Sequence, residues 1–238
     1  DHIPLTESAS STESSSSGND KALIDWSLSK LQHPEAEKLI RRYEAMALWA
    51  EQAALEMDFR FLFNKRRKLF SIGFNLENEQ LDRSYYDLLC SESRLASYFA
   101  IAKHDVDASH WFQLGRQSTV NEGEGTLLSW GGTMFEFLMP ALFQRTYEGS
   151  LLAHTYRSAI NQQKRYAASK KVPWGISESA YATMAPNGDY QYQSFGVPGL
   201  GLKRGLTKDL VVSPYSTLLA IAIDPVAAYA NLQQLRQH

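Results

Sequence analysis

Three glutamates stand where a carboxyl group could take part in chemistry. Glu178 lies in a long aromatic and glycine-rich stretch, residues 172–205. Glu92 recurs with large apolar residues at helical spacing, and Glu136 is the only charge in the apolar run 134–144. A lone buried charge is costly, so each carboxylate needs a cation, hydrogen-bond donors or a polar cavity. Two carboxyl groups facing a glycosidic bond can cleave it: one protonates the leaving oxygen, and the other attacks the anomeric carbon or activates water.

The stretch 172–205 predicts the wall of a concave binding site. Its rings stand among glycines and a tight-turn sequence, Pro186-Asn187-Gly188-Asp189, whose Asn and Gly tolerate positive φ. A long loop of this composition is poorly suited to a core, and loops on a rigid scaffold usually carry function. We therefore expect a polar, ring-shaped ligand, namely a carbohydrate. The candidate substrate-binding residues are Trp130, Trp174, Tyr181, Tyr190, Tyr192, Asp87, Lys203 and Arg204.

Each candidate also has a purely structural interpretation. Glu178 could cap a loop by accepting backbone N–H bonds, and Glu136 could cap a neighbouring loop. Glu92 could form an ion pair with Arg83 or with another buried cation. Core packing explains any single aromatic ring equally well, and a solvated turn explains the basic pair 203–204.

Composition excludes several classes of function. The chain has 238 residues and a net charge of −2, which gives no basic surface for nucleic acid or an anionic membrane. Its longest apolar candidate, residues 134–143, is too short to span a bilayer. The single cysteine, Cys90, excludes an internal disulfide and a thiolate metal site, and the six histidines lack ligand spacing. We expect neither a metal nor another cofactor.

The order of elements predicts an all-α fold with helical-hairpin packing. The Ser-rich residues 1–20 are predicted to be a disordered linker, followed by a folded region over 21–238. Apolar residues recur there at three- and four-residue steps, and several runs begin with proline or serine. Helices are predicted over residues 34–57, 84–103, 134–146, 150–170, 214–223 and 225–237, with a short hairpin at 59–74 and a strand or extended lead-in at 126–132.

The predicted helix 84–103 places two of the candidates. Ser84 and Asp87 are spaced as a variant of the capping box. Asp87 falls on the other side of this helix from Glu92, where it would support Arg94 or ligand hydroxyls. Glu92 shares its face with large apolar residues, namely Tyr85, Leu88, Leu95 and Phe99.

Four long motifs follow one another from about residue 40 to the C-terminus. They are residues 59–63 with 67–74 (FRFLF, RKLFSIGF), 85–89 with 91–97 (YYDLL, SESRLAS), 128–136 (LSWGGTMFE), and the stretch 172–205. In this order they resemble the glycoamylase-like domain of cyclic β-1,2-glucan synthases, which is related to bacterial endo-β-1,2-glucanases.

The resemblance implies part of an (α/α)6 barrel, a partial toroid, acting on β-1,2-linked glucose chains. The implied activity is transglycosylation, the cleavage and re-joining of glucan chains that controls their length or cyclises them. It favours Glu92 and Glu178 as the catalytic pair, with Glu136 third. A retaining transferase would use Glu178 as nucleophile and Glu92 as acid/base. A hydrolytic endo-β-1,2-glucanase and a non-catalytic glucan-binding scaffold stay open.

The same resemblance implies two partners, β-1,2-glucan and the remaining domains of a larger synthase. It also implies a place on the cytoplasmic side of the bacterial inner membrane. Because the family domain continues with further helices, we expect the chain alone to be a poor catalyst.

Overall fold

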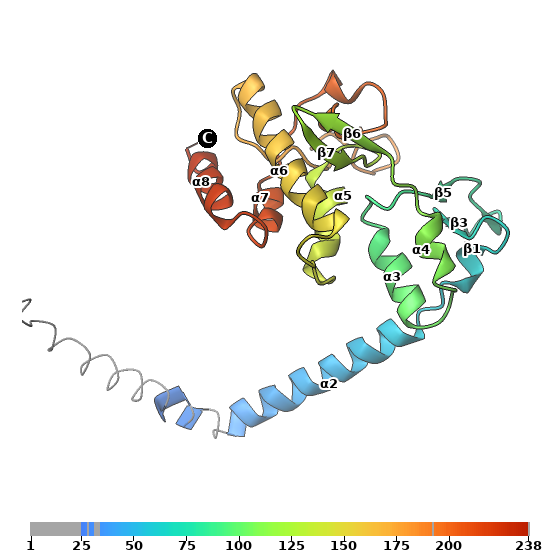
Figure 1. The fold of residues 1–238 in the computed structure, drawn as a ribbon. Helices are drawn as coiled ribbons and strands as arrows, with labels where there is room; N and C mark the ends of the chain where they lie inside the picture. Colours follow the sequence, from blue (N-terminus) through green and yellow to red (C-terminus); the bar gives the residue numbers. More distant parts are fainter. Residues whose placement is uncertain (1–24, 28, 31–33, 192, 238) are drawn as a thin grey trace, which may run out of the picture. The chain divides into compact units, whose positions relative to one another are not determined.

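The computed structural model describes residues 25–27, 29–30, 34–191 and 193–237 (Figure 1). The predicted linker, residues 1–20, lies outside them. The chain divides into two compact units, residues 1–57 and 58–238. In the first unit, helix α2 spans Pro34–Glu56, which confirms the helix predicted there. Pro34 fixes a helical φ at its start, and Glu35 and Glu37 stabilise its first turn.

The second unit begins with short antiparallel strands. A 3-10 turn, η1 (Arg60–Leu62), leads into β1 (Phe63–Asn64), which pairs with β2 (Leu69–Ser71). The predicted hairpin is therefore present, although its first arm is mostly a 3-10 turn. Two further pairs follow in the chain: β3 (Phe74–Asn75) with β4 (Gln80–Leu81), and β6 (Ser118–Asn121) with β7 (Glu124–Leu127).

The all-α prediction is wrong, because the fold is mixed and contains three small antiparallel sheets beside its helices. The main error is the helix predicted over 84–103. Tyr85–Tyr86 instead form β5, the third strand of the sheet β1-β2-β5. Leu89 then donates its N–H to Gly115 O at 2.9 Å. These long-range bonds use the backbone groups that a helix would need, so α3 begins only at Arg94 and spans Arg94–Ala102.

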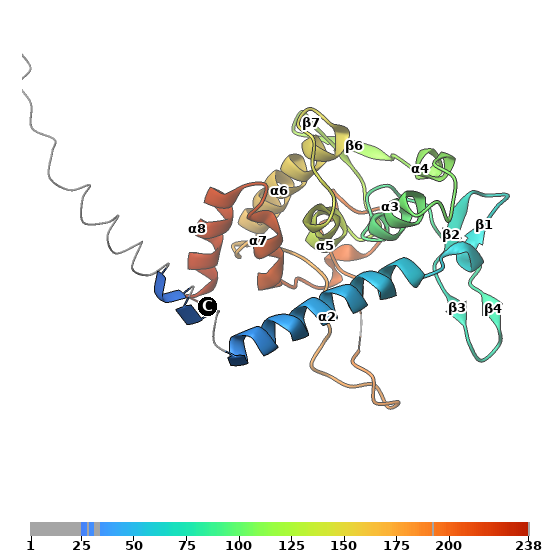
Figure 2. The ribbon, with the colours of Figure 1, turned by 90° about the horizontal axis from the view of Figure 1, so that it is seen from below.

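Further helices follow in the chain, and several of them contribute to the main core. They are α4 (Ser109–Gln113), α5 (Met134–Leu138), the 3-10 turn η2 (Met139–Leu142), α6 (Leu151–Lys170), η3 (Leu206–Lys208), α7 (Pro214–Ala220) and α8 (Pro225–Leu235). The run predicted as one helix over 134–146 changes to a 3-10 turn at Met139, one residue before Pro140, which has no N–H to donate. The other predicted helices are confirmed to within a few residues. Helix α5 contacts both α6 and α7, as the two views in Figures 1 and 2 show.

The stretch 172–205 contributes to the core, although its composition predicts a loop that is poorly suited to one. Its two ends are buried in the main core, which includes Trp174, Ile176, Phe195 and Leu200. Only its middle is an exposed hairpin, closed by the turn 186–189, where Gly188 has a φ of 88°. Within the part of the chain that the structure describes, no helix is long and apolar enough to cross a membrane.

Candidate active site

A cleft of about 510 Å³ brings the three candidate glutamates together. Glu92 comes from the turn before α3, Glu136 from α5, and Glu178 from the first buried end of the stretch 172–205. The residues that line the cleft are Ile72, Ser84, Tyr85, Tyr86, Asp87, Leu88, Ser91, Glu92, Trp130, Glu136 and Glu178. Residues far apart in the chain therefore place three carboxyl groups in one hollow.

Glu136 is held in place by its own helix terminus. Thr133 is the N-cap of α5 and forms a capping box with Glu136. Glu136 Oε1 accepts from Gly131 N at 2.8 Å, and Oε2 accepts from Ser129 Oγ at 2.9 Å and from Thr133 N at 2.9 Å. The residue is 4% exposed. The alternative considered from the sequence, a glutamate that caps a neighbouring loop, describes these contacts.

Glu92 reaches the cleft from a turn, and not from the helix face on which the sequence places it. Its residue is half-buried, and Oε2 accepts from Ser91 Oγ at 3.1 Å. It forms no ion pair with Arg83 or with any other cation among the described residues. Burial raises the pKa of the Glu92 carboxyl, and the charge of Glu136 adds to the effect.

Glu178 is anchored through its backbone, which leaves its side chain free to face the cleft. Its carbonyl oxygen accepts from Tyr215 OH at 2.9 Å and from Ser213 Oγ at 3.4 Å. Burial raises the pKa of Glu178 to about 7, and the charges of Glu136 and Glu92 contribute in that order. Such a carboxyl group gains and loses its proton near neutral pH, well above the range of an ordinary glutamate.

Tyr86 also lines the cleft, and the charges of two of the glutamates affect the pKa of its hydroxyl. The pKa of Tyr86 is raised by burial and then by the charges of Glu92 and Glu178. Tyr86 therefore keeps its proton and can donate a hydrogen bond into the cleft. Sequence reasoning did not select it, although its neighbour Tyr85 and Asp87 also line the hollow. The Tyr85-Tyr86-Asp87 motif could have indicated Tyr86, but the apolar periodicity predicts a helix there, where the structure has a strand at the edge of a sheet.

The other predicted binding residues divide into three groups. Asp87 and Trp130 line the cleft, and Trp130 is 58% exposed, so its ring is available for stacking. Trp174 is 8% exposed and belongs to the core, away from the cleft lining. The remaining candidates lie outside the lining or outside the described residues. Tyr181 donates to Asp209, and Tyr190 is exposed on the hairpin. Lys203 donates its backbone N–H to Trp130 O, and Arg204 is exposed. Tyr192 lies outside the described residues.

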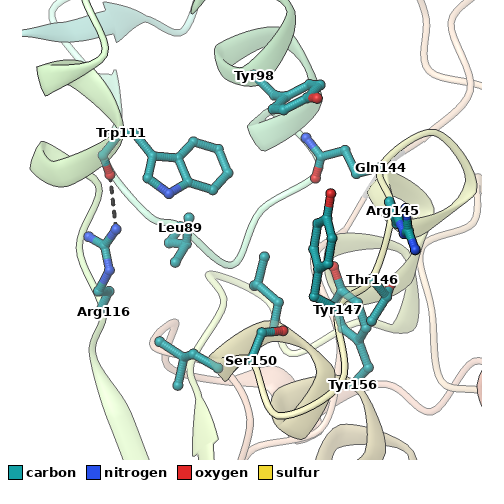
Figure 3. Close-up of a pocket in the computed structure, with 12 residues that line it drawn as sticks. Leu89, Tyr98, Trp111, Arg116, Gln144, Arg145, Thr146, Tyr147, Ser150 and Tyr156 are labelled. Carbon is teal, nitrogen blue, oxygen red and sulfur yellow. Dashed lines mark hydrogen bonds between the residues drawn. The ribbon is translucent and has the colours of Figure 1, made fainter.

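A second hollow, of about 320 Å³, has a different lining (Figure 3). The rings of Tyr98, Trp111 and Tyr147 stand around it, together with Arg116 and Gln144. None of its lining residues is a carboxylate, so two-carboxylate chemistry belongs to the first cleft. In the described ranges, no group of three His, Cys, Asp or Glu side chains is placed to hold a metal ion.

Comparison with known proteins decides the family. Residues 84–238 match the family model named Glycoamylase, described as "Putative glucoamylase". The chain belongs to this family. The cleft, with all of its lining residues except Ile72, falls inside the part matched to the glycoamylase family, which confirms the resemblance drawn from the motifs.

A curated relative is similar to most of this chain. The chain is 44% identical over 201 residues to the cyclic beta-(1,2)-glucan synthase NdvB of Rhizobium meliloti (strain 1021). The alignment covers 84% of this chain and 7% of that relative. The chain therefore spans a small part of the length of the curated relative that it matches.

Proposed function

We propose that the cleft cleaves and re-joins β-1,2-linked glucan chains, with Glu92 and Glu178 as the reacting carboxyl groups. The observation that carries this proposal is the meeting of Glu92, Glu136 and Glu178 with the exposed ring of Trp130 in one hollow. The identity to a cyclic beta-(1,2)-glucan synthase supports the choice of substrate. The chain would act as one domain of a larger synthase on the cytoplasmic side of the bacterial inner membrane.

In this mechanism Glu92 is the acid/base and Glu178 the nucleophile. The Glu92 proton passes to the glycosidic oxygen as that bond to the anomeric carbon breaks, and a Glu178 carboxylate oxygen bonds to the same carbon. The hydroxyl of an acceptor sugar then attacks the anomeric carbon, releases Glu178 and returns its proton to Glu92. Retention suits a transferase, because the covalent intermediate keeps the sugar activated for a second acceptor.

The raised pKa values bear on this assignment. Glu178 keeps a proton to about pH 7, and Glu92 also binds its proton more tightly than an ordinary glutamate. The active form of the pair would carry its proton on Glu92, with Glu178 ionised beneath the anomeric carbon. Tyr86, which keeps its own proton, would donate a hydrogen bond to the substrate or to Glu178.

The test is incubation of linear β-1,2-glucan with the natural full-length protein, followed by analysis of product sizes and anomeric form. We expect longer, shorter or cyclic products with retained configuration, and loss of all products in Glu92→Gln and Glu178→Gln. Exposed Glu148, which pairs with Arg157, supplies the control variant Glu148→Gln. Reducing ends formed only by water, with inverted configuration, would identify a hydrolase instead. Glucan binding with no change in chain length, in wild type and variants alike, would indicate a scaffold.

A further inference from the structure

Glu136 lies in the cleft, yet its carboxylate is already fully engaged. Its two oxygens accept from Ser129, Gly131 and Thr133, and Thr133 contributes both its N–H and its hydroxyl. A carboxylate that attacked a sugar or gave up a proton would have to leave these donors. The same donors would then be left without partners in a buried site, which destabilises the folded chain. Glu136 is therefore poorly suited to react.

The contacts also fix the charge of Glu136. The two backbone N–H groups act only as donors, and the Ser129 hydroxyl is directed to Oε2 as a donor. An ionised carboxylate is an acceptor at both oxygens, whereas a protonated one would need an acceptor of its own. The arrangement therefore favours the anion. With 4% of the residue exposed, water screens this charge far less than it screens a surface glutamate.

Several titratable groups of the described residues lie around this anion. Tyr85, Tyr86, Asp87, Glu92 and Glu178 line the same cleft. Burial raises the pKa of the Cys90 thiol to about 12, the charge of Arg94 opposes the rise, and the charge of Glu136 adds to it. Arg94 is a buried cation whose charge lowers the pKa of Glu92. Its hydrogen bonds go to neutral groups, namely Leu89 O at 3.0 Å, Gln144 Oε1 at 3.2 Å, Tyr156 OH at 2.9 Å and Phe137 O at 3.5 Å.

The donors to Glu136 also determine where Trp130 stands. Ser129 and Gly131 flank this tryptophan in the chain, and both donate to the Glu136 carboxylate. Ser129 Oγ in turn accepts from Gly132 N at 2.8 Å. One side chain of α5 therefore fastens the loop on both sides of the exposed ring in the cleft.

We propose that Glu136 is a positioning residue with two effects: its fixed negative charge keeps a proton on the Glu92–Glu178 pair, and its hydrogen bonds hold Trp130 at the cleft wall. The inference deepens the proposed function and rests on it for its catalytic meaning. The like charge favours the protonated state of a neighbouring carboxyl group, so the cleft retains an acid near neutral pH. Glu136 itself contributes neither an attacking oxygen nor the transferred proton.

The charge effect is tested on the 238-residue chain without substrate. The side-chain carboxyl carbons of glutamate are labelled with carbon-13 and titrated by NMR, and Glu178→Gln identifies the Glu178 signal. We expect this signal to titrate near pH 7 in wild type and about one pH unit lower in Glu136→Gln. The exposed control Glu148→Gln should leave it unchanged. A Glu178 titration that is the same in wild type and in folded Glu136→Gln would overturn the inference.

A second variant, Glu136→Asp, separates the effect of the Glu136 charge from the effect of its hydrogen bonds. It also tests the inference if Glu136→Gln does not fold. Glu136→Asp keeps the charge but is too short to reach both Ser129 and Gly131. We expect the Glu178 titration to stay near pH 7 while the indole N–H resonance of Trp130, assigned with Trp130→Phe, shifts. Loss of the raised Glu178 titration together with an unmoved Trp130 signal would refute both effects.

These readouts also separate this inference from the proposed function. The titration needs no glucan, so a protein that never cleaves glucan can still show the predicted change at Glu178. Conversely, a full-length protein that cleaves glucan, with the Glu178 titration unmoved in Glu136→Gln, would refute the role of Glu136 and leave the catalytic pair intact.

Discussion

Replacing Glu178 with glutamine should stabilise the folded chain at alkaline pH. The pKa of Glu178 rises from an ordinary value of 4.5 to about 7 on folding. The folded state therefore binds this proton more tightly than the unfolded state does. The favourable contribution is fully present below pH 4.5, and it is lost as the pH rises through about 7. Above that pH the folded chain holds an ionised Glu178 that burial and two like charges disfavour.

The magnitude follows from the same values. A rise from 4.5 to about 7 corresponds to about 3.5 kcal/mol, at about 1.4 kcal/mol for each pH unit. Because Glu178 is half-buried and faces an open cleft, solvent screening reduces this to about 1–2 kcal/mol. A neutral glutamine removes the penalty. For a chain of this size, a gain of that order raises the melting temperature by roughly 2–8 °C.

The assay is thermal unfolding of wild type and Glu178→Gln at pH 5 and pH 8.5, with Glu148→Gln as the control. We expect the melting temperatures of wild type and Glu178→Gln to differ little at pH 5 and clearly at pH 8.5, where the glutamine variant is the more stable. Equal melting temperatures at pH 8.5, or a less stable glutamine variant, would refute the reasoning that the cleft disfavours a charged Glu178.

Two further predictions separate residues of the cleft from residues of the core. Trp130→Ala should weaken β-1,2-glucan binding by about 1–3 kcal/mol, by analogy with base stacking on aromatic rings. It should change the melting temperature little, because the ring is 58% exposed. Calorimetric binding and thermal unfolding measure the two effects, and an unchanged affinity would contradict the stacking role. Trp174→Ala should instead cost about 3–5 kcal/mol of stability, measured by denaturant unfolding, and a loss below 1 kcal/mol would show that this ring is not part of the core. Gly196→Ala should lower the melting temperature strongly, because a Cβ there would lie 1.8 Å from Gly131 O, and an unchanged melting temperature would contradict that close approach.

The sequence was sufficient where local signals decide the structure. Helix α6 has the Ser150 cap, whose side chain accepts from Ala153 N, and a long apolar periodicity. It was predicted almost to the residue. Helix α8 likewise follows the Asp224-Pro225 start, and Asp224 Oδ1 accepts from Ala227 N at 3.0 Å. Local hydrogen bonds and local periodicity are both visible in the chain itself.

The sequence was insufficient where long-range pairing overrides periodicity. The residues from Tyr85 to Phe99 carry a helical apolar pattern, but Tyr86 is paired with Phe70, and Leu89 with Gly115. Nothing local signals these partners. The three glutamates nevertheless line one cleft, and the motifs that contain them fall in the part of the chain that matches the family. The burial of Trp174 could not be predicted, since an aromatic residue in a glycine-rich stretch gives no sign of whether its ring packs inward.

The anchoring of Glu178 has a consequence for the order in which the cleft forms during translation. Its loop is fastened by residues that the ribosome adds later. Tyr215 and Ser213 hold the Glu178 carbonyl, and the Asn231 side chain exchanges hydrogen bonds with the backbone N–H and C=O of Trp174, 57 positions away. The segments that carry Glu92 and Glu136 leave the ribosome well before these anchors exist. The cleft is therefore completed only after α8 has emerged, so a nascent chain holds two of its three carboxyl groups before the third has a fixed place.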